Sequence, residues 1–413
     1  MGWLRAHRKS LECLRSPLTD SHSFGAVPAM PIKFLIFSLT AVLPLAALRA
    51  GPENRVTYDV NSTAENPRND VGAFITLKSG RILSYYPQFY TGSSDYSSPR
   101  LVEIHSDDQG RSWSQPKIFA EKGDNVNLMS VSFLRLASGR IAMFYVVKRS
   151  GLDCHPYLRL SSDEGATWSA PRPVIEPPGY FVLNNDRAIQ TSTGRLIVPV
   201  AFNRLLKPAE SEPGGPHASS TDVRGIILWY LSDDEGATWR EADSWWAMPV
   251  PSANGLQEPG VVELADGSLF SWARTDQGEQ FEFRSRDGGK TWSPPQPTEL
   301  KSPCSPASIK RLPHSSALLA LYNDYSGKFP FHKTESPYGG RAPLVAAIST
   351  DGGRTWPVRK LLEGDLNGQF AYPAIYFTGD AVLLSYNTGA ADGPHLGGLR
   401  IRRVALSWLE SSP

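Results

Sequence analysis

SDDEGATW, residues 232–239, is one of five octamers of the form S-x-D-x-G-x-[ST]-W in this 413-residue chain. The other four are SDDQGRSW (106–113), SSDEGATW (161–168), SRDGGKTW (285–292) and STDGGRTW (349–356). The steps from one tryptophan to the next are 55, 71, 53 and 64 residues. Self-similarity at such a spacing is the signature of a repeat architecture, so each octamer marks one structural unit.

The chemistry of the octamer is that of a β-hairpin turn. Its aspartate can accept backbone N–H bonds within the turn, and its glycine supplies a positive φ. The Ser/Thr ties the far side of the turn, and the tryptophan packs back as an apolar plug. Apolar stretches that precede the turns, such as 101–105 and 225–230, are the expected strands.

A second repeat interleaves with the octamers. Residues 73–83 read as an apolar strand, a glycine turn and another strand, and the same pattern recurs around Gly139, Gly194, Gly267, Ser315-Ser316 and Gly379. Six such units, each a four-stranded antiparallel sheet, predict an all-β fold, a six-bladed β-propeller over residues 51–413. Residues 399–406 and a strand near Val56 would complete the sixth blade. A sandwich or solenoid with the same turns is the alternative, and residues 207–221 read as a loop insertion.

Composition narrows the function classes. The chain has 42 Lys and Arg against 41 Asp and Glu, whereas binding to nucleic acid requires a clustered basic excess. We therefore expect no nucleic-acid partner. At 40% apolar residues, the chain can bury a sizeable core.

The N-terminal part resembles a leader. Lys33 precedes the apolar stretch 34–48, which has the shape of a signal peptide over approximately residues 30–50. We expect residues 1–50 to be leader and signal peptide, with Met30 as a possible true start, and the mature protein to be secreted or periplasmic. An uncleaved anchor is the alternative, but no stable membrane span is expected in the mature chain. Cys154 and Cys304 are the cysteines left after residue 50.

The octamer is the Asp box, and its five copies on six units resemble the exo-α-sialidase (neuraminidase) family over residues 51–413. The resemblance implies a site at the propeller axis that removes a terminal α-linked sialic acid. In that family the Asp boxes lie away from the site, so their expected role is structural. The substrate carries a carboxylate on its anomeric carbon, which the planar fork of arginine binds bidentately. A tyrosine nucleophile avoids the repulsion that a carboxylate nucleophile would meet there.

The resemblance carries over to six residues. Glu258, in QEPGVVELADGSL (257–269), matches the glutamate that activates the nucleophile, and Tyr372, in FAYPAI (370–375), resembles the nucleophile itself. Asp95, eleven residues before Ser106, matches the acid/base aspartate. The arginine cluster that would bind the carboxylate is matched by Arg68, Arg274 and Arg341. No cofactor and no metal is required by this chemistry.

Departures from the family pattern concern Arg68. The family usually has an apolar residue and a proline after this arginine, but the chain reads Arg68-Asn69-Asp70. Asn387 stands where a glutamate often supports the same arginine. Arg187, which also leads an inner strand, competes with Arg68 for its place in the cluster. His155 and His314 have no partners at ligand spacing and are expected at the surface.

The leading hypothesis is therefore an exported retaining exo-glycosidase that acts on sialylated or other acidic glycans through a tyrosyl-glycoside intermediate. One alternative is a carbohydrate-binding propeller without catalysis. The other, motivated by the sequence after Arg68, is a hydrolase or lyase of a different acidic sugar.

Overall fold

Short β-strands make up most of the chain in the computed structural model, which describes residues 53–410 except 122, 126, 207–220, 335–339 and 391–395. Ala50–Pro413 forms one compact unit, distinct from Met1–Arg49. The predicted leader and nearly all of the predicted loop insertion lie outside the described residues. Among the described residues, the one helix is α1 (Leu406–Glu410), and no helix is long and apolar enough to cross a membrane.

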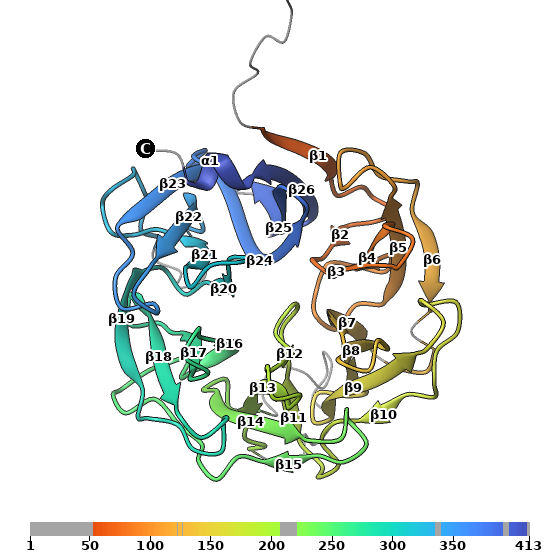
Figure 1. The fold of residues 1–413 in the computed structure, drawn as a ribbon, viewed down its shortest axis with the longest axis horizontal. Coiled ribbons are helices and arrows are strands. Elements are labelled where there is room, and N and C mark those ends of the chain that lie inside the picture. The colour runs from red at the N-terminus through yellow and green to blue at the C-terminus, as the bar shows by residue number, and fades with distance from the viewer. Residues whose placement is uncertain are drawn as a thin grey trace, which may run out of the picture. The chain divides into compact units, whose positions relative to one another are not determined.

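The strands form six blades around a common centre, and the sequence passes from blade to blade around the ring (Figure 1). The first blade contains β2 (Arg68–Asn69), β3 (Ala73–Thr76), β4 (Ile82–Phe89), β5 (Pro99–Ser106) and β6 (Lys117–Ala120). The second contains β7 (Asn127–Arg135), β8 (Ile141–Lys148), β9 (Cys154–Ser161) and β10 (Arg172–Pro173). The third contains β11 (Tyr180–Val182), β12 (Ile189–Gln190), β13 (Leu196–Asn203), β14 (Ile226–Ser232) and β15 (Arg240–Glu241).

The remaining blades are regular four-stranded antiparallel sheets. The fourth contains β16 (Gln257–Glu263), β17 (Leu269–Arg274), β18 (Glu279–Ser285) and β19 (Gln296–Lys301). The fifth contains β20 (Ser308–Arg311), β21 (Leu318–Asn323), β22 (Leu344–Ser349) and β23 (Val358–Glu363). The sixth contains β24 (Gly368–Thr378), β25 (Ala381–Ala390), β26 (Gly398–Ala405) and β1 (Asn54–Val60). The predicted six-bladed propeller is confirmed.

One departure from four-stranded blades is the continuous sheet that joins the second and third blades. The short strand β11 pairs antiparallel with β13 and, at Tyr180 and Cys154, parallel with β9. Through β11, the sheet of the second blade continues into the sheet of the third.

The sixth blade closes the ring by pairing both ends of the propeller. β1 runs antiparallel to β26, with register from Asn54 opposite Val404 to Val60 opposite Leu399. Arg403, whose side chain is buried, donates to the Asp380 carboxylate at 2.9 Å and to the carbonyl of Gln109 at 3.0 Å. Gln109 belongs to the first octamer, so Arg403 also ties the last blade to the first.

All five octamers fold into the same turn at the end of the third strand of a blade. In the fifth blade, Asp351 accepts hydrogen bonds from the Ser349 hydroxyl (2.8 Å), the Thr355 N–H (2.9 Å) and the Thr355 hydroxyl (2.6 Å). Gly353 has φ of 86°, and a Cβ there would lie 3.0 Å from Phe270 of the preceding blade. The position therefore requires glycine for both conformation and space.

The octamer tryptophans pack sideways into the preceding blade, and so do more than plug their own turns. Trp292 of the fourth blade stacks on Trp229 of β14, with ring centroids 4.4 Å apart and planes 13° apart. The same relation holds around the ring, in Trp113 with Tyr58, Trp168 with Phe119, Trp239 with Phe144, and Trp356 in one cluster with Phe270. Each Asp box therefore joins two neighbouring blades.

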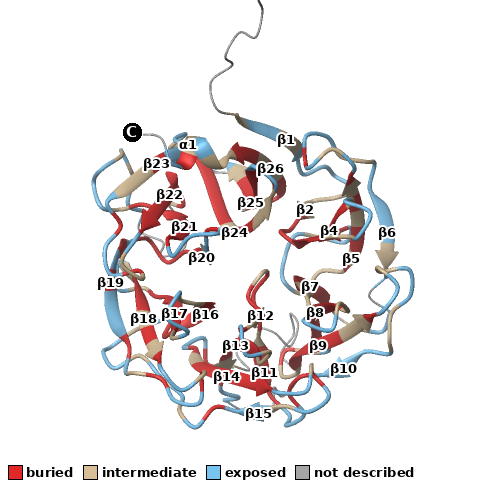
Figure 2. Cartoon of the chain, in the orientation of Figure 1, coloured by how far each residue is buried: buried red, intermediate tan, exposed pale blue. Residues whose placement is uncertain are grey.

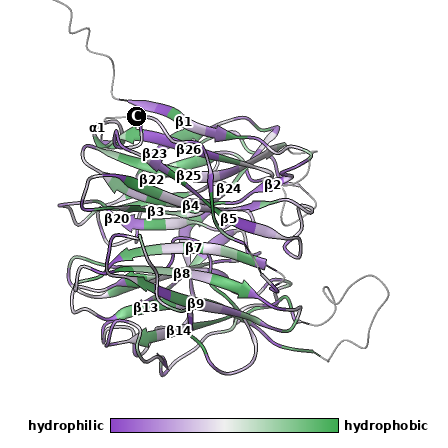
Figure 3. Cartoon of the chain, turned by 90° about the vertical axis from the view of Figure 1, so that its right-hand side faces the viewer, coloured by the Kyte–Doolittle hydropathy of each residue, from purple (hydrophilic) through white to green (hydrophobic). Residues whose placement is uncertain are grey.

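Burial follows the radial order of the strands (Figure 2). The second strands β4, β8, β17 and β21 are buried at every residue, whereas the outermost strands β10 and β15 are exposed. In the side view of Figure 3, apolar and polar stretches alternate along the strands that face the viewer. The core thus lies between the blades.

The ring has two distinct faces. In the fourth blade, Gln257 pairs with Arg274 at one end of the sheet, and Leu269 pairs with Ser285 at the other. First strands therefore begin at one face, here called the entry face, and octamers lie at the opposite, Asp-box face. A seven-residue strand separates them by about 20 Å.

The Asp-box hydrogen bonds lead to a prediction for Asp351. Burial alone would raise the pKa of its carboxyl, but the hydrogen bonds from Thr355 and Ser349 lower it to about 2. This carboxylate therefore stabilises the fold fully above about pH 4, and its contribution is lost as the pH falls towards 2. Asp351→Asn should lower the free energy of unfolding by about 1 kcal/mol at pH 7, the usual worth of one hydrogen bond. Denaturant titrations should show the difference shrinking between pH 4 and pH 2, and a pH-independent difference would contradict the assignment.

Candidate active site

A cleft lies at the entry face, lined by residues from the first strands of several blades and from the loops beside them. Those first strands border the centre of the ring (Figure 1). Four of the six predicted site residues line it: Arg68, Asp95, Glu258 and Tyr372. They come from three different blades, so the fold brings together residues up to about 300 positions apart.

Arg68 lies at the start of the first blade, and its guanidinium is held by two carboxylates. It donates to Asp95 at 2.6 Å and to Asp70 at 2.7 Å, and also to the carbonyl of Ser93 at 3.2 Å. Its guanidinium carbon lies 4.8 Å from the centre of the Phe89 ring. Burial would lower the pKa of Arg68, but the charges of Asp70 and Asp95 outweigh burial and raise it. Asp70 thus supplies the supporting carboxylate that the family often places at the position of Asn387.

Asp95 lies on the loop between β4 and β5, and 56% of its side chain is exposed. Partial burial would raise the pKa of its carboxyl. The charges of Arg68, Lys148 and Arg274 outweigh that effect and lower the pKa to about 2. At neutral pH, Asp95 is therefore an ionised acceptor rather than a proton donor.

Glu258 and Arg274 form a buried ion pair across the fourth blade. The Arg274 guanidinium donates to the Glu258 carboxylate at 2.9 Å, and the two side chains are 8% and 12% exposed. Glu258 faces the cleft, whereas Arg274 lies behind it, at the end of β17. Arg274 holds the carboxylate in place.

Tyr372 and Arg341 form a cation–π contact beside this ion pair. The guanidinium carbon of Arg341 lies 5.3 Å from the centre of the Tyr372 ring, and one of its N–H groups donates to the carbonyl of Cys304 at 3.3 Å. Burial and the nearby Glu258 charge raise the pKa of the Tyr372 hydroxyl, and Arg341 and Arg274 partly oppose them. The phenol therefore requires a base to become a nucleophile at neutral pH.

In three blades, the first strand carries a β-bulge where it meets the cleft. Each bulge contains a residue with positive φ: Ser130 (61°) in β7, Glu258 (48°) in β16 and Tyr372 (55°) in β24. Non-glycine residues adopt this conformation at a cost of about 1–3 kcal/mol, and such residues cluster at functional sites. The bulge turns side chains that would alternate along the strand towards the cleft.

Two sequence predictions are corrected or resolved by the structure. Arg187 is fully buried and donates to the Ser308 hydroxyl (2.5 Å) and the Ala307 carbonyl (2.7 Å), so it ties the third blade to the fifth and does not line the cleft. Burial lowers its pKa to about 10. The prediction of His155 at the surface is wrong, because its imidazole is buried between Asp153 and the carbonyl of Pro177.

Sequence reasoning missed three polar residues of the cleft region. Asp70 holds Arg68, and Lys148 and Asn127 both donate to the carbonyl of Asp95, at 3.2 and 2.8 Å. Lys148 is the last residue of an otherwise apolar strand, and Asn127 is the first residue of the strand beside it. A polar residue at the entry-face end of an inner strand is the signal that would have identified them.

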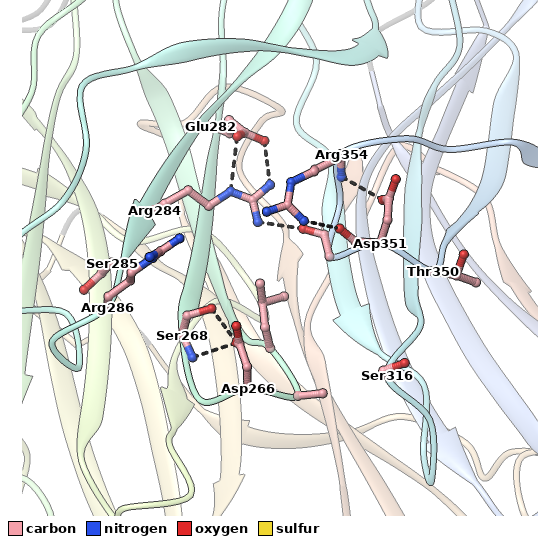
Figure 4. A pocket seen from close by; sticks show the side chains of 13 residues that line it. Asp266, Ser268, Glu282, Arg284, Ser285, Arg286, Ser316, Thr350, Asp351 and Arg354 are labelled. Atoms are coloured by element: carbon pink, nitrogen blue, oxygen red, sulfur yellow. Dashed lines mark hydrogen bonds and ion pairs between the residues drawn. The ribbon is translucent and has the colours of Figure 1, made fainter.

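A larger cleft lies on the Asp-box face and is lined by residues of the fourth and fifth blades (Figure 4). Arg284 there donates to Glu282 at 3.1 and 2.8 Å and to the carbonyl of Gly352 at 2.6 Å, and Asp266 accepts from Ser268. Its lining contains no tyrosine and none of the six predicted site residues, so this cleft is not the candidate active site. In the described part of the chain, no group of three His, Cys, Asp or Glu side chains could hold a metal ion.

Comparison with known proteins supports the resemblance. Residues 88–384 match the BNR repeat-like domain family. A sialidase of Bacteroides fragilis is 26% identical over 368 residues, covering 79% of this chain and 60% of the relative. A sialidase of Micromonospora viridifaciens is 24% identical over 435 residues, covering 96% and 61%. The chain thus spans about 60% of the length of these curated relatives.

Solved structures show the same fold. A Hadza microbial sialidase superposes with a TM-score of 0.62 at 19% identity, covering 83% of this chain and 67% of that one. A leech intramolecular trans-sialidase gives a TM-score of 0.64 at 15% identity, covering 87% and 71%. The predicted resemblance to the exo-α-sialidase family is confirmed.

The two cysteines at the site lead to a prediction. Cys154 and Cys304 are both buried and unpaired, and burial raises the pKa of the Cys154 thiol to about 12. Because the thiolate is the reactive form, iodoacetamide at pH 8 should leave Cys154 unmodified in the native protein and alkylate it after unfolding. Peptide mass spectrometry checks this, with Cys304→Ser as the control that isolates Cys154. Rapid native labelling of Cys154 would contradict the described burial.

Proposed function

Because the chain belongs to the BNR repeat-like domain family, we propose that it is an exo-α-sialidase-type glycoside hydrolase. The observation that carries the proposal is one cleft in which a tyrosine, two carboxylates and a cation from three blades face one another. The sialidases among its relatives support the substrate class, a terminal α-linked sialic acid or related acidic sugar. A glycan carrying such a sugar is the proposed partner.

Binding begins with the carboxylate of the substrate. Arg68, Arg274 and Arg341 lie on the cleft or immediately behind its Glu258 and Tyr372 walls, and together they supply the cationic environment that an anion requires. Arg68 is the most accessible of the three to a ligand, because it lines the cleft directly. The substrate carboxylate would displace the Asp95 carboxylate from Arg68.

Nucleophilic attack is assigned to Tyr372. Its raised pKa means that its hydroxyl stays protonated at neutral pH, so Glu258 takes the proton as the Tyr372 oxygen attacks the anomeric carbon. Arg274 holds the Glu258 carboxylate in position for this transfer. The bond to the leaving oxygen breaks while the new bond to tyrosine forms, and the product of this step is a tyrosyl glycoside.

The leaving oxygen needs a proton, and Asp95 is positioned to supply it. The charges of Arg68 and Lys148 are the main cause of its pKa of about 2. When the substrate carboxylate binds Arg68, its negative charge offsets that of the arginine and raises the pKa of Asp95. Asp95 then acts as the acid in the first step and, once ionised, as the base that activates water in the second. Two displacements at the anomeric carbon give overall retention.

The alternatives differ in what they predict. A carbohydrate-binding propeller would bind glycans without turnover, and its affinity would be indifferent to Asp95→Ala. A hydrolase or lyase of another acidic sugar would turn over a different glycan and leave α-sialosides intact. A glycan array followed by analysis of the released products separates the three.

We also propose that the protein is exported, to the periplasm or outside the cell. The support is the apolar stretch 34–48 that follows Lys33. Mass spectrometry of the N-terminus of the protein made by its native host should show a mature chain that begins near residue 51. A cytoplasmic protein that begins at Met1 or Met30 would overturn this proposal.

Removal of the nucleophile provides the main prediction. Tyr372→Phe should lower kcat/KM for a fluorogenic α-sialoside by about 10³-fold or more, because the ring remains but the attacking oxygen is gone. Tyr376→Phe is the matched control on the same strand, where the hydroxyl bonds Thr76 and does not line the cleft. The control should retain near-wild-type turnover. Absence of turnover by the wild type on every α-sialoside linkage would overturn the substrate assignment.

Stereochemistry provides an independent prediction. Proton NMR during the first minutes of hydrolysis should show the α-anomer of the released sugar before mutarotation, because two displacements retain the configuration. First appearance of the β-anomer would exclude the tyrosyl intermediate while leaving the hydrolase assignment in place.

A further inference from the structure

The loop that carries Asp95 is hydrogen-bonded to the second blade through the backbone oxygen of Asp95. The backbone oxygen of Asp95 accepts hydrogen bonds from Asn127 at 2.8 Å and from the Lys148 ammonium at 3.2 Å. Both donors are buried, with 0% and 4% of their surface exposed, whereas Asp95 itself is exposed. Two buried polar side chains from the neighbouring blade thus determine where an otherwise open loop lies.

The Lys148 ammonium is itself held in place by aromatic rings. It lies 4.3 Å from the centre of the Tyr96 ring and 5.6 Å from the centre of the Tyr180 ring. Tyr96 follows Asp95 on the same loop, and Tyr180 belongs to the short connecting strand β11. Attraction between a buried cation and aromatic faces fixes the charge next to the loop.

We propose that Lys148 is the positioning residue for Asp95: it fixes the Asp95 loop, and its charge sets the pH at which the carboxylate takes up its proton during the reaction. This inference rests on the proposed function and deepens it. Arg68 makes a direct ion pair with Asp95, but the substrate carboxylate competes for that arginine. Lys148 bonds the backbone rather than the carboxylate, so its charge remains next to Asp95 when the substrate is bound.

Other groups face Asp95 and contribute to its titration. Besides Tyr96 on its own loop, they are Arg68, Lys148, Cys154, Tyr180, Arg274 and Tyr372. The cysteine and the tyrosines are neutral at neutral pH, because burial raises the pKa of each of them. The substrate carboxylate neutralises Arg68, and Glu258 pairs with Arg274. Lys148 is then the cation whose charge still lowers the pKa of Asp95.

The test uses the pH dependence of kcat/KM and kcat for an α-sialyl-oligosaccharide. A general acid must be protonated, so activity falls as the pH rises through the pKa of Asp95. Lys148→Gln keeps a donor for the Asp95 carbonyl but removes the charge, which raises that pKa. Its descending limb should therefore move to higher pH by about one unit. Lys148→Arg, which keeps the charge, should leave the limb in place.

Asn127→Ala is the matched control for position without charge. It removes the other hydrogen bond to the same carbonyl and should lower kcat/KM by about tenfold at every pH, with an unmoved limb. A fluorogenic aryl sialoside needs less acid assistance, so each Lys148 variant should affect it less than the oligosaccharide. A Lys148→Gln limb within about 0.3 unit of wild type, in a variant whose circular dichroism shows that it is folded, would overturn the proposal.

A measurement without turnover keeps this inference distinct from the proposed function. In a double-mutant cycle, Lys148→Gln and Asp95→Asn should change Tm non-additively at pH 7, and additively near pH 2, where Asp95 is half protonated or more. Additive changes at both pH values would contradict the charge coupling, whatever the enzyme assays show. Absence of wild-type turnover together with a coupled cycle would instead contradict the hydrolase assignment alone.

Discussion

The contact between each Asp-box tryptophan and the preceding blade is the interaction on which the rest of the structure depends. A propeller blade buries its hydrophobic faces only against its neighbours, so the angle between blades is determined by what packs between them. Trp292 on Trp229 shows how closely the contact fits, with nearly parallel rings. The octamer glycine lets the turn approach the neighbouring blade, and the aspartate holds the turn in the shape that presents the tryptophan.

The candidate site depends on that angle because no blade contains it. Arg68 and Asp95 come from the first blade, Glu258 from the fourth and Tyr372 from the sixth. Their convergence is therefore a property of the whole ring. The positive φ values at Glu258 and Tyr372 add local strain, which the surrounding packing supports. Stabilising contacts on one face of the ring thus permit strained, preorganised groups on the other.

The fold could be predicted from the sequence because each blade carries the same recognisable sequence pattern. Five octamers and six strand-turn-strand units count the blades, and the strand near Val56 was expected to close the ring, as β1 does. The site was harder, because it depends on contacts between segments far apart in sequence. Asp95, Glu258 and Tyr372 lie where the family pattern placed them, in one cleft. Their roles remain predictions.

What the sequence could not reveal was the identity of the supporting residues. Asp70 supports Arg68 from two positions along the chain, which the departure from the family pattern concealed. Arg187 had the right residue type and strand position but points into an interface between blades, and strand position alone does not distinguish these outcomes. Lys148 ends an apolar strand, and its supporting role depends on contact with the Asp95 loop, which the sequence does not reveal.

The pairing of β1 with β26 has a consequence for how the protein is made. The partners are about 350 residues apart, so the ring cannot close until the last strand has left the ribosome. Before then, the blades form an open arc whose terminal blades expose the apolar faces that the closed ring buries, and such surfaces are the kind on which chaperones act. A chain that crosses a membrane unfolded would meet the same requirement on the far side. Circular permutation that joins β26 directly to β1 would make these two strands a hairpin of neighbouring residues. The pairing could then form without waiting for the rest of the chain.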